Sequence, residues 1–99
     1  MIRVEIKKNS ITVKGHANSS LYGTDIVCAS VSTAVIMSVN QIYLFDKAQN
    51  VDAVVSEGNA KITVVSEDDI VNKIIDNLVF TLKDLELQYP KYIKINEKL

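Results

Sequence analysis

The sequence contains one histidine, His16, and one cysteine, Cys28, and a short polar segment separates them. His16 lies in Gly15-His16-Ala17, which ends a strand-like run, and Cys28 lies in Asp25-Ile26-Val27-Cys28-Ala29, which opens a helix-like run. A strand–loop–helix turn can bring an imidazole and a thiol face to face, and that pair is the minimum apparatus of a cysteine nucleophile with its base. No other residues in the sequence offer comparable chemistry.

Two features could favour the thiolate of Cys28. If Asp25 is the N-cap of the helix, Cys28 is its third residue and lies in the first turn, where unpaired backbone N–H groups and the helix dipole favour an anion. His16 could also take the thiol proton. The same N–H groups could stabilise a tetrahedral oxyanion.

The neighbouring polar residues have two interpretations each. Asp25 acts either as the helix cap or as the group that orients His16. Ser32 lies one turn after Cys28 and either bonds within the site or bonds back to the Cys28 carbonyl. Leu21 and Tyr22 are candidate substrate contacts in a loop that Gly23 would hinge.

An inert interpretation is also open. A single cysteine in an apolar helix is usually a small buried hydrophobe, and a single histidine after a glycine is usually a loop residue. Their joint position at the two ends of one loop is what favours a site. One His and one Cys are too few for a structural zinc site, which needs four ligands, so we expect no metal and no cofactor.

Alternating apolar residues predict a β-hairpin over 1–15, and an apolar run predicts a helix from Asp25 to about Leu44. A second hairpin is expected over 51–65, followed by a helix capped by Ser66 and ending near Gln88, and by an edge strand over 92–96. The predicted order is ββαββα(β). This is an α/β (α+β type) fold, a small mixed sheet packed with two helices.

The 99 residues predict one domain over 1–99, with a net charge of −1 and only one adjacent basic pair, Lys7-Lys8. Dispersed basic residues give no footprint for nucleic acid, so no direct nucleic-acid contact is expected. No run of about 18 apolar residues is present, so no membrane span is expected. The single cysteine fits a reducing cytoplasm. The surplus apolar surface of 26–44 predicts a homodimer.

Around these residues the chain resembles the ribosomal-processing cysteine protease family, Prp. The resemblance rests on three blocks in register: Gly15-His16-Ala17, Gly23 with Asp25-Ile26-Val27-Cys28-Ala29, and Val31-Ser32. It implies a cytoplasmic homodimeric endopeptidase with Cys28 as nucleophile and His16 as general acid and base. It also implies a substrate, the N-terminal extension of large-subunit ribosomal protein twenty-seven.

One position departs from the resemblance. Many family members carry an acidic residue directly after Gly-His-Ala, and this chain has Asn18. An amide can still orient an imidazole by accepting its N–H. The rival hypothesis is a non-catalytic ribosome-associated binding or assembly module with an inert Cys28, and the rate of thiol alkylation distinguishes the two.

Overall fold

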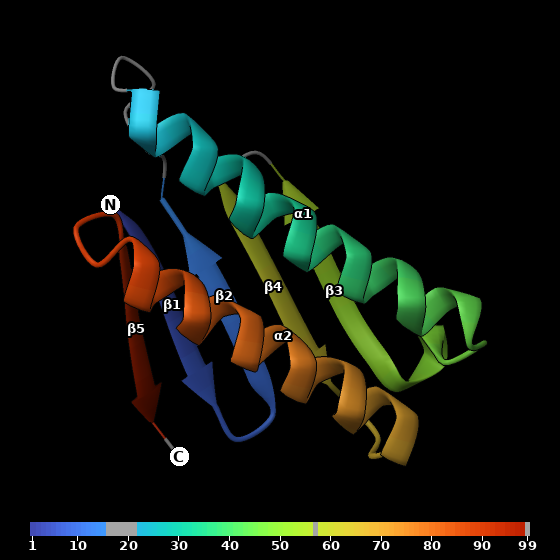
Figure 1. Ribbon diagram of the computed structural model, residues 1–99. Helices are drawn as coiled ribbons and strands as arrows, with labels where there is room; N and C mark the ends of the chain where they lie inside the picture. Colours follow the sequence, from blue (N-terminus) through green and yellow to red (C-terminus); the bar gives the residue numbers. More distant parts are fainter. Residues whose placement is uncertain (16–21, 57, 99) are drawn as a thin grey trace.

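The computed structural model describes residues 1–15, 22–56 and 58–98, with the side chains of 22–25 excepted. Two helices lie side by side across one face of a five-stranded sheet and leave the other face uncovered (Figure 1). The elements in chain order are β1 (Ile2–Lys7), β2 (Ser10–Lys14), α1 (Tyr22–Leu44), a short 3₁₀ turn (Ala48–Asn50), β3 (Val51–Ser56), β4 (Asn59–Val64), α2 (Asp69–Gln88) and β5 (Ile93–Lys98). The predicted fold class and the order ββαββα with a final strand are confirmed.

The sheet has the strand order β3-β4-β2-β1-β5. β5 pairs with β1 in parallel, and the other neighbours are antiparallel, so the sheet is mixed. Because successive side chains of a strand point to opposite faces, the alternation in β1 buries Ile2, Val4 and Ile6 under the helices. The predicted edge strand at the C-terminal end is β5, and it lies at the outer edge beside β1.

Each helix packs one face on the sheet. α1 contributes Val27, Val31, Val35 and Val39 to the core, which are all buried. α2 contributes a stripe at helical spacing, whose buried members are Val71, Ile74, Leu78 and Leu82. Fully burying one such side chain stabilises the fold by about 1.5–3 kcal/mol, so these two stripes fix how the helices lie on the sheet.

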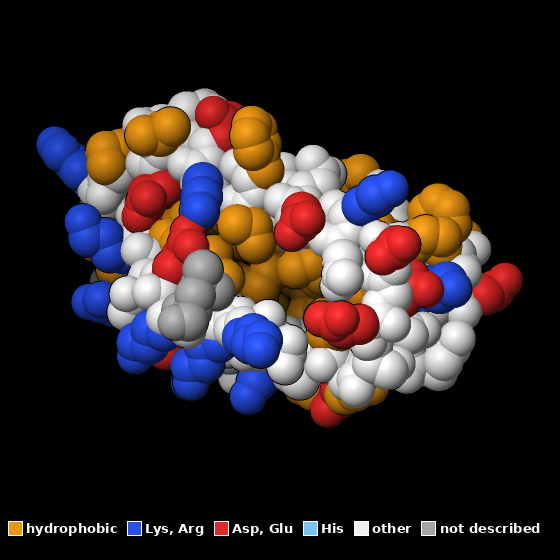
Figure 2. Space-filling model, turned by 90° about the horizontal axis from the view of Figure 1, so that it is seen from below, with side chains coloured by type: hydrophobic (Ala, Val, Ile, Leu, Met, Phe, Trp, Pro, Cys, Tyr) orange, Lys and Arg blue, Asp and Glu red, His pale blue; other side chains and the backbone are white. Residues whose placement is uncertain are grey.

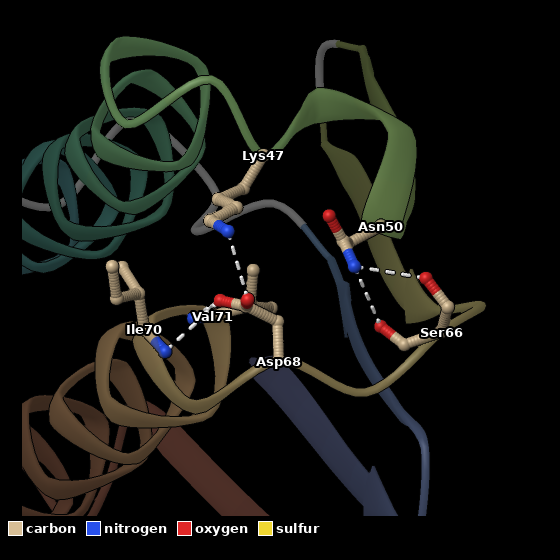
Figure 3. Close-up of polar contacts among 6 residues, drawn as sticks. All are labelled: Lys47, Asn50, Ser66, Asp68, Ile70 and Val71. Carbon is tan, nitrogen blue, oxygen red and sulfur yellow. Dashed lines mark hydrogen bonds and ion pairs between the residues drawn. The ribbon is translucent and has the colours of Figure 1, made fainter.

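A polar cluster joins the end of α1 to the start of α2 (Figure 3). The cap of α2 is Asp68, and the prediction of Ser66 is wrong: Asp68 accepts the N–H groups of Ile70 at 3.0 Å and Val71 at 3.1 Å. Ser66 instead accepts the side-chain amide of Asn50 at 2.9 Å. Lys47 lies 2.9 Å from the second oxygen of Asp68, so one carboxylate serves both the cap and an ion pair.

The outer side of α1 is exposed and apolar. Ile26, Ile36, Met37 and Leu44 are all exposed there, although the helix buries its opposite face. By length and composition alone, the segment Ile26–Leu44 could cross a membrane, but the core helix of a soluble protein meets the same criterion. One face of α1 packs on the sheet, so the exposed apolar side chains lie on its outer side.

Candidate active site

The backbone that leads into His16 is fixed at Gly15. The Gly15 N–H donates to the Gly58 carbonyl oxygen at 3.0 Å, which ties the end of β2 to the turn between β3 and β4. Gly15 has φ = +116°, and a Cβ there would collide with the Met1 carbonyl oxygen. Only glycine fits such a backbone without strain. The sequence identified Gly15 as part of a motif, whereas its steric role depends on where Met1 lies.

Cys28 lies in the second turn of α1, because the helix begins at Tyr22 and not after Asp25. The thiol is partly buried and packs against the core cluster that contains Val27 and Val31. The prediction that Cys28 occupies the first turn is therefore wrong. Its backbone N–H falls where an α-helix already supplies a carbonyl four residues earlier, so this N–H cannot serve as an unpaired donor for an anion.

The same boundary corrects the role of Asp25. A residue inside the helix is not its N-cap, so the capping interpretation is wrong and the orienting interpretation stays a prediction. The sequence-based prediction places the helix start too late because it assigns Gly23 to the preceding loop as its hinge. One glycine inside a helix costs only about 1 kcal/mol, and the helix continues through it.

Three predicted residues, His16, Asn18 and Leu21, lie outside the described residues. Tyr22 and Gly23 are in the first turn of α1, so the predicted substrate loop gives way to helix at Tyr22, and the side chain of Tyr22 is not described. The approach of His16 to Cys28 stays a prediction. The structure does describe the elements on either side of this segment: β2, which ends at Lys14, and α1, which carries Cys28 in its second turn.

Ser32 lies one helical turn after Cys28 and is exposed. Two other serines of α1 bond back to carbonyls four residues earlier: Ser30 to Ile26 at 2.9 Å and Ser38 to Ala34 at 2.8 Å. Within the described residues, Ser32 makes no such bond to Cys28. Its hydroxyl is therefore available on the surface beside the Cys28 turn.

The chain also has a hollow of about 260 Å³ at the other end of the sheet, near the β1–β2 turn (Figure 2). Its apolar floor includes Ile11, Ile62 and Val79, and Lys8 and Asp76 are among the charged residues around it. Cys28 is not among its lining residues. Among the side chains that the structure describes, no group of three or more His, Cys, Asp or Glu could hold a metal ion.

Comparison with known proteins assigns the class. A family profile described as cysteine protease Prp matches residues 1–94, so the chain is a cysteine protease. It belongs to the Prp family. A ribosomal processing cysteine protease Prp of Staphylococcus aureus is 30% identical over 106 residues, covering 99% of this chain and all of the relative.

Two solved structures of Staphylococcus aureus Prp share the fold over 99% of this chain and 100% of theirs. One holds a substrate peptide and matches with a TM-score of 0.88 at 28% identity. The other holds a covalently linked product peptide and matches with a TM-score of 0.86 at 29% identity. The family expected from the motifs around His16 and Cys28 is thus confirmed.

Proposed function

We propose that Cys28 is the nucleophile of this cysteine protease and that His16 is its general acid and base. The observation that carries the proposal is the position of the only cysteine. It lies in the second turn of α1, the first helix after the β2 strand that ends at Lys14 and leads through Gly15 directly into His16. A cysteine protease needs a thiol, and Cys28 is the only thiol in the sequence.

The reaction divides into two steps. His16 takes the thiol proton while the sulfur of Cys28 attacks the scissile carbonyl carbon, and His16 then gives that proton to the leaving amine as the C–N bond breaks. The acyl part of the substrate remains on Cys28 as a thioester. Water then attacks the thioester carbon, His16 takes its proton, and the Cys28 thiol is released with the proton restored.

The Staphylococcus aureus relative supports a covalent route, since one of its structures holds a covalently linked product peptide. A thioester to a cysteine is the covalent species that this route requires. The unpaired N–H groups at the start of α1 do not contribute to activation of the thiol, because Cys28 lies beyond the first turn of the helix. The proposal therefore assigns activation of the thiol to His16 alone.

We assign the substrate as the N-terminal extension of a large-subunit ribosomal protein, the ribosomal protein twenty-seven that the family resemblance implies. The Staphylococcus aureus relatives are named ribosomal processing proteases, and one of them holds a substrate peptide. Removal of an N-terminal extension cuts a peptide bond inside the chain, so the cleavage is endopeptidic. Leu21 and Tyr22 are the apolar candidates to contact it.

The test is cleavage of a synthetic peptide that spans this extension, followed by mass spectrometry. Wild type should cut at one bond, and Cys28→Ala and His16→Ala should each lose activity by at least 10²-fold, the scale of one acid–base contribution. Ser30→Ala is the matched control, because Ser30 lies on the same helix and its hydroxyl donates to the Ile26 carbonyl oxygen one turn earlier. Undiminished cleavage by either site variant would refute the assignment.

The outer side of α1 supports a homodimer. Ile36 and Met37 are about half exposed, at 47% and 56%, and Leu44 is 82% exposed. Exposed apolar side chains on one side of a helix are typical of interaction sites. Sedimentation equilibrium should give twice the chain mass of 11.0 kDa. Ile36→Lys should give the monomer, and Phe80→Lys on α2 should not. A monomeric wild type would contradict this proposal.

The compartment is proposed as the cytoplasm. The mechanism needs Cys28 as a reduced thiol, and a reducing compartment keeps it so. Cell fractionation with an antibody against the chain tests this assignment, and recovery outside the cytoplasmic fraction would contradict it.

A further inference from the structure

The face of the sheet that the helices leave uncovered, called here the open sheet face, concentrates positive charge. Among the side chains that the structure describes, it carries six of the eleven Lys and Arg residues and two carboxylates. The cations are Arg3, Lys7, Lys14, Lys61, Lys94 and Lys98, and the carboxylates are Glu5 and Asp52. Figure 2 shows Lys and Arg side chains gathered along one side of the molecule, at the lower left.

Cross-strand register makes this arrangement unfavourable by itself. Arg3 is the partner of Lys14 on β2 and of Lys94 on β5, and Lys7 is the partner of Lys98. Neighbouring strands lie about 4.8 Å apart, and like charges directly opposite each other destabilise a sheet. An anion that bridges Lys94, Arg3 and Lys14 would relieve this repulsion.

The face is only partly neutralised from within. Glu5 lies 3.0 Å from Lys98 and 3.8 Å from Lys7. The hydrogen bond and charge of Lys98, with smaller contributions from Lys7 and Lys14, hold the pKa of Glu5 below its ordinary value. Within the described residues, the remaining four cations form no ion pair: Arg3, Lys14, Lys61 and Lys94.

We propose that the open sheet face binds RNA through the phosphate backbone. Four exposed, unneutralised cations spread over β5, β1, β2 and β4 match a chain of regularly spaced phosphates. Thr12, Asn59 and Asn96 lie among them, and hydroxyl and amide groups of this kind bond to phosphate and sugar oxygens. The proposal replaces the expectation of no nucleic-acid contact. Basic residues at alternate strand positions are dispersed along the sequence, but the pairing of the strands brings them together on one face of the sheet.

The same face argues for RNA over two other partners. Among the strand residues of this face that the structure describes, Val54 is the only exposed large apolar one, so the strands offer little apolar surface to insert into a lipid bilayer. No aromatic side chain lies on the described part of the face, so it offers bases no aromatic ring to stack on, and binding should depend little on sequence. A folded acidic protein would not present the evenly repeated charge that the row Lys94–Arg3–Lys14 fits.

The experiment measures anisotropy of a fluorescent single-stranded uridine 20-mer against the full chain at several salt concentrations. Four phosphate contacts give a slope of log K against log salt of about −2.8, a loss of about 50-fold between 50 and 200 mM salt. Arg3→Gln with Lys14→Gln should reduce the slope to about −1.4. Lys73→Gln with Lys91→Gln is the matched control, with the same charge change away from this face, and should leave the slope unchanged.

The outcomes separate the partners and the protease assignment. Because Arg3 and Lys14 repel each other, their neutralisation should not lower the melting temperature, so weaker binding cannot be ascribed to unfolding. No RNA binding by wild type, equal effects of the two double variants, or binding only to phosphatidylserine vesicles or polyglutamate would overturn the proposal. Binding is measured without cleavage, so it stands or falls independently of Cys28.

Discussion

The backbone N–H of Gly15 donates to the carbonyl oxygen of Gly58 at 3.0 Å, so the residue before His16 is tied to the turn between the edge strand β3 and its neighbour β4. On its other side Gly15 lies against the backbone of Met1, with φ = +116°. The chain therefore leads into His16 through a backbone conformation at Gly15 that residues other than glycine rarely adopt.

Gly15→Ala should lower both stability and cleavage. The φ strain alone costs about 1–3 kcal/mol, and the clash with the Met1 carbonyl adds to it. Urea unfolding measures the free energy, and the peptide assay measures the rate. Gly58→Asn serves as the control, because φ = 72° lies in the region that Asn tolerates. An unchanged Gly15→Ala variant would mean that the β2 end does not need this conformation.

Asp68 should give the fold an acid-dependent contribution to stability. A hydrogen bond from Lys47, together with those from the Val71 and Ile70 backbones, holds the pKa of Asp68 below its ordinary value. The contribution is thus fully present above the unfolded pKa and is lost as the pH falls through the folded pKa.

The measurement compares urea midpoints of wild type and Asp68→Asn at neutral pH and at a series of pH values below the ordinary aspartate pKa of about 3.9. Asn can still cap the helix but cannot ionise, so the difference between the two proteins should shrink on acidification. Lys47→Met, which removes only the ion pair, should lie between them. Equal acid sensitivity of wild type and Asp68→Asn would show that another carboxylate controls this range.

Leu82 and Leu87 offer a matched pair on α2. Leu82 is fully buried and Leu87 is 80% exposed. Leu82→Ala should lower the free energy of unfolding by about 2–5 kcal/mol, because it leaves a cavity between α2 and the sheet. Leu87→Ala should change it by less than about 0.5 kcal/mol. Equal effects would contradict the assigned face of α2.

Asp25→Asn should separate activity from stability. Asp25 lies inside α1 and is not its cap, so the substitution should leave the melting temperature nearly unchanged. If Asp25 orients His16, kcat should fall while KM holds. Asn18→Ala with the same readouts tests the other orienting candidate. A fall in melting temperature without a fall in kcat would assign Asp25 a purely structural role.

The sequence predicted those parts of the fold that depend on local periodicity. Period-two alternation located the first hairpin and β5. The Gly58-Asn59 turn between two β-rich runs located the second hairpin, and the stripe of Ile74, Leu78 and Leu82 located α2. It missed the helix starts, since polar residues near Asp25 and Ser66 offer several possible caps and tertiary partners decide between them. At α2 the N-cap is Asp68, which is also the residue that pairs with Lys47.

The arrangement of the site depends on contacts that no local pattern records. The collision that requires glycine at position 15 comes from Met1, which packs there only once β1 and β2 pair. The charge on the open sheet face likewise depends on register across four strands. By contrast, the family was predicted correctly from the blocks around His16 and Cys28, because residue types and spacing are local.

The most direct test of the account is intact-mass analysis of the protein quenched with acid during cleavage of the substrate peptide. The account predicts an adduct with the mass of the acyl part of the substrate, located on the fragment that contains Cys28 and absent from Cys28→Ala. Cleavage that proceeds with no adduct, and equally in Cys28→Ala, would contradict Cys28 as the nucleophile.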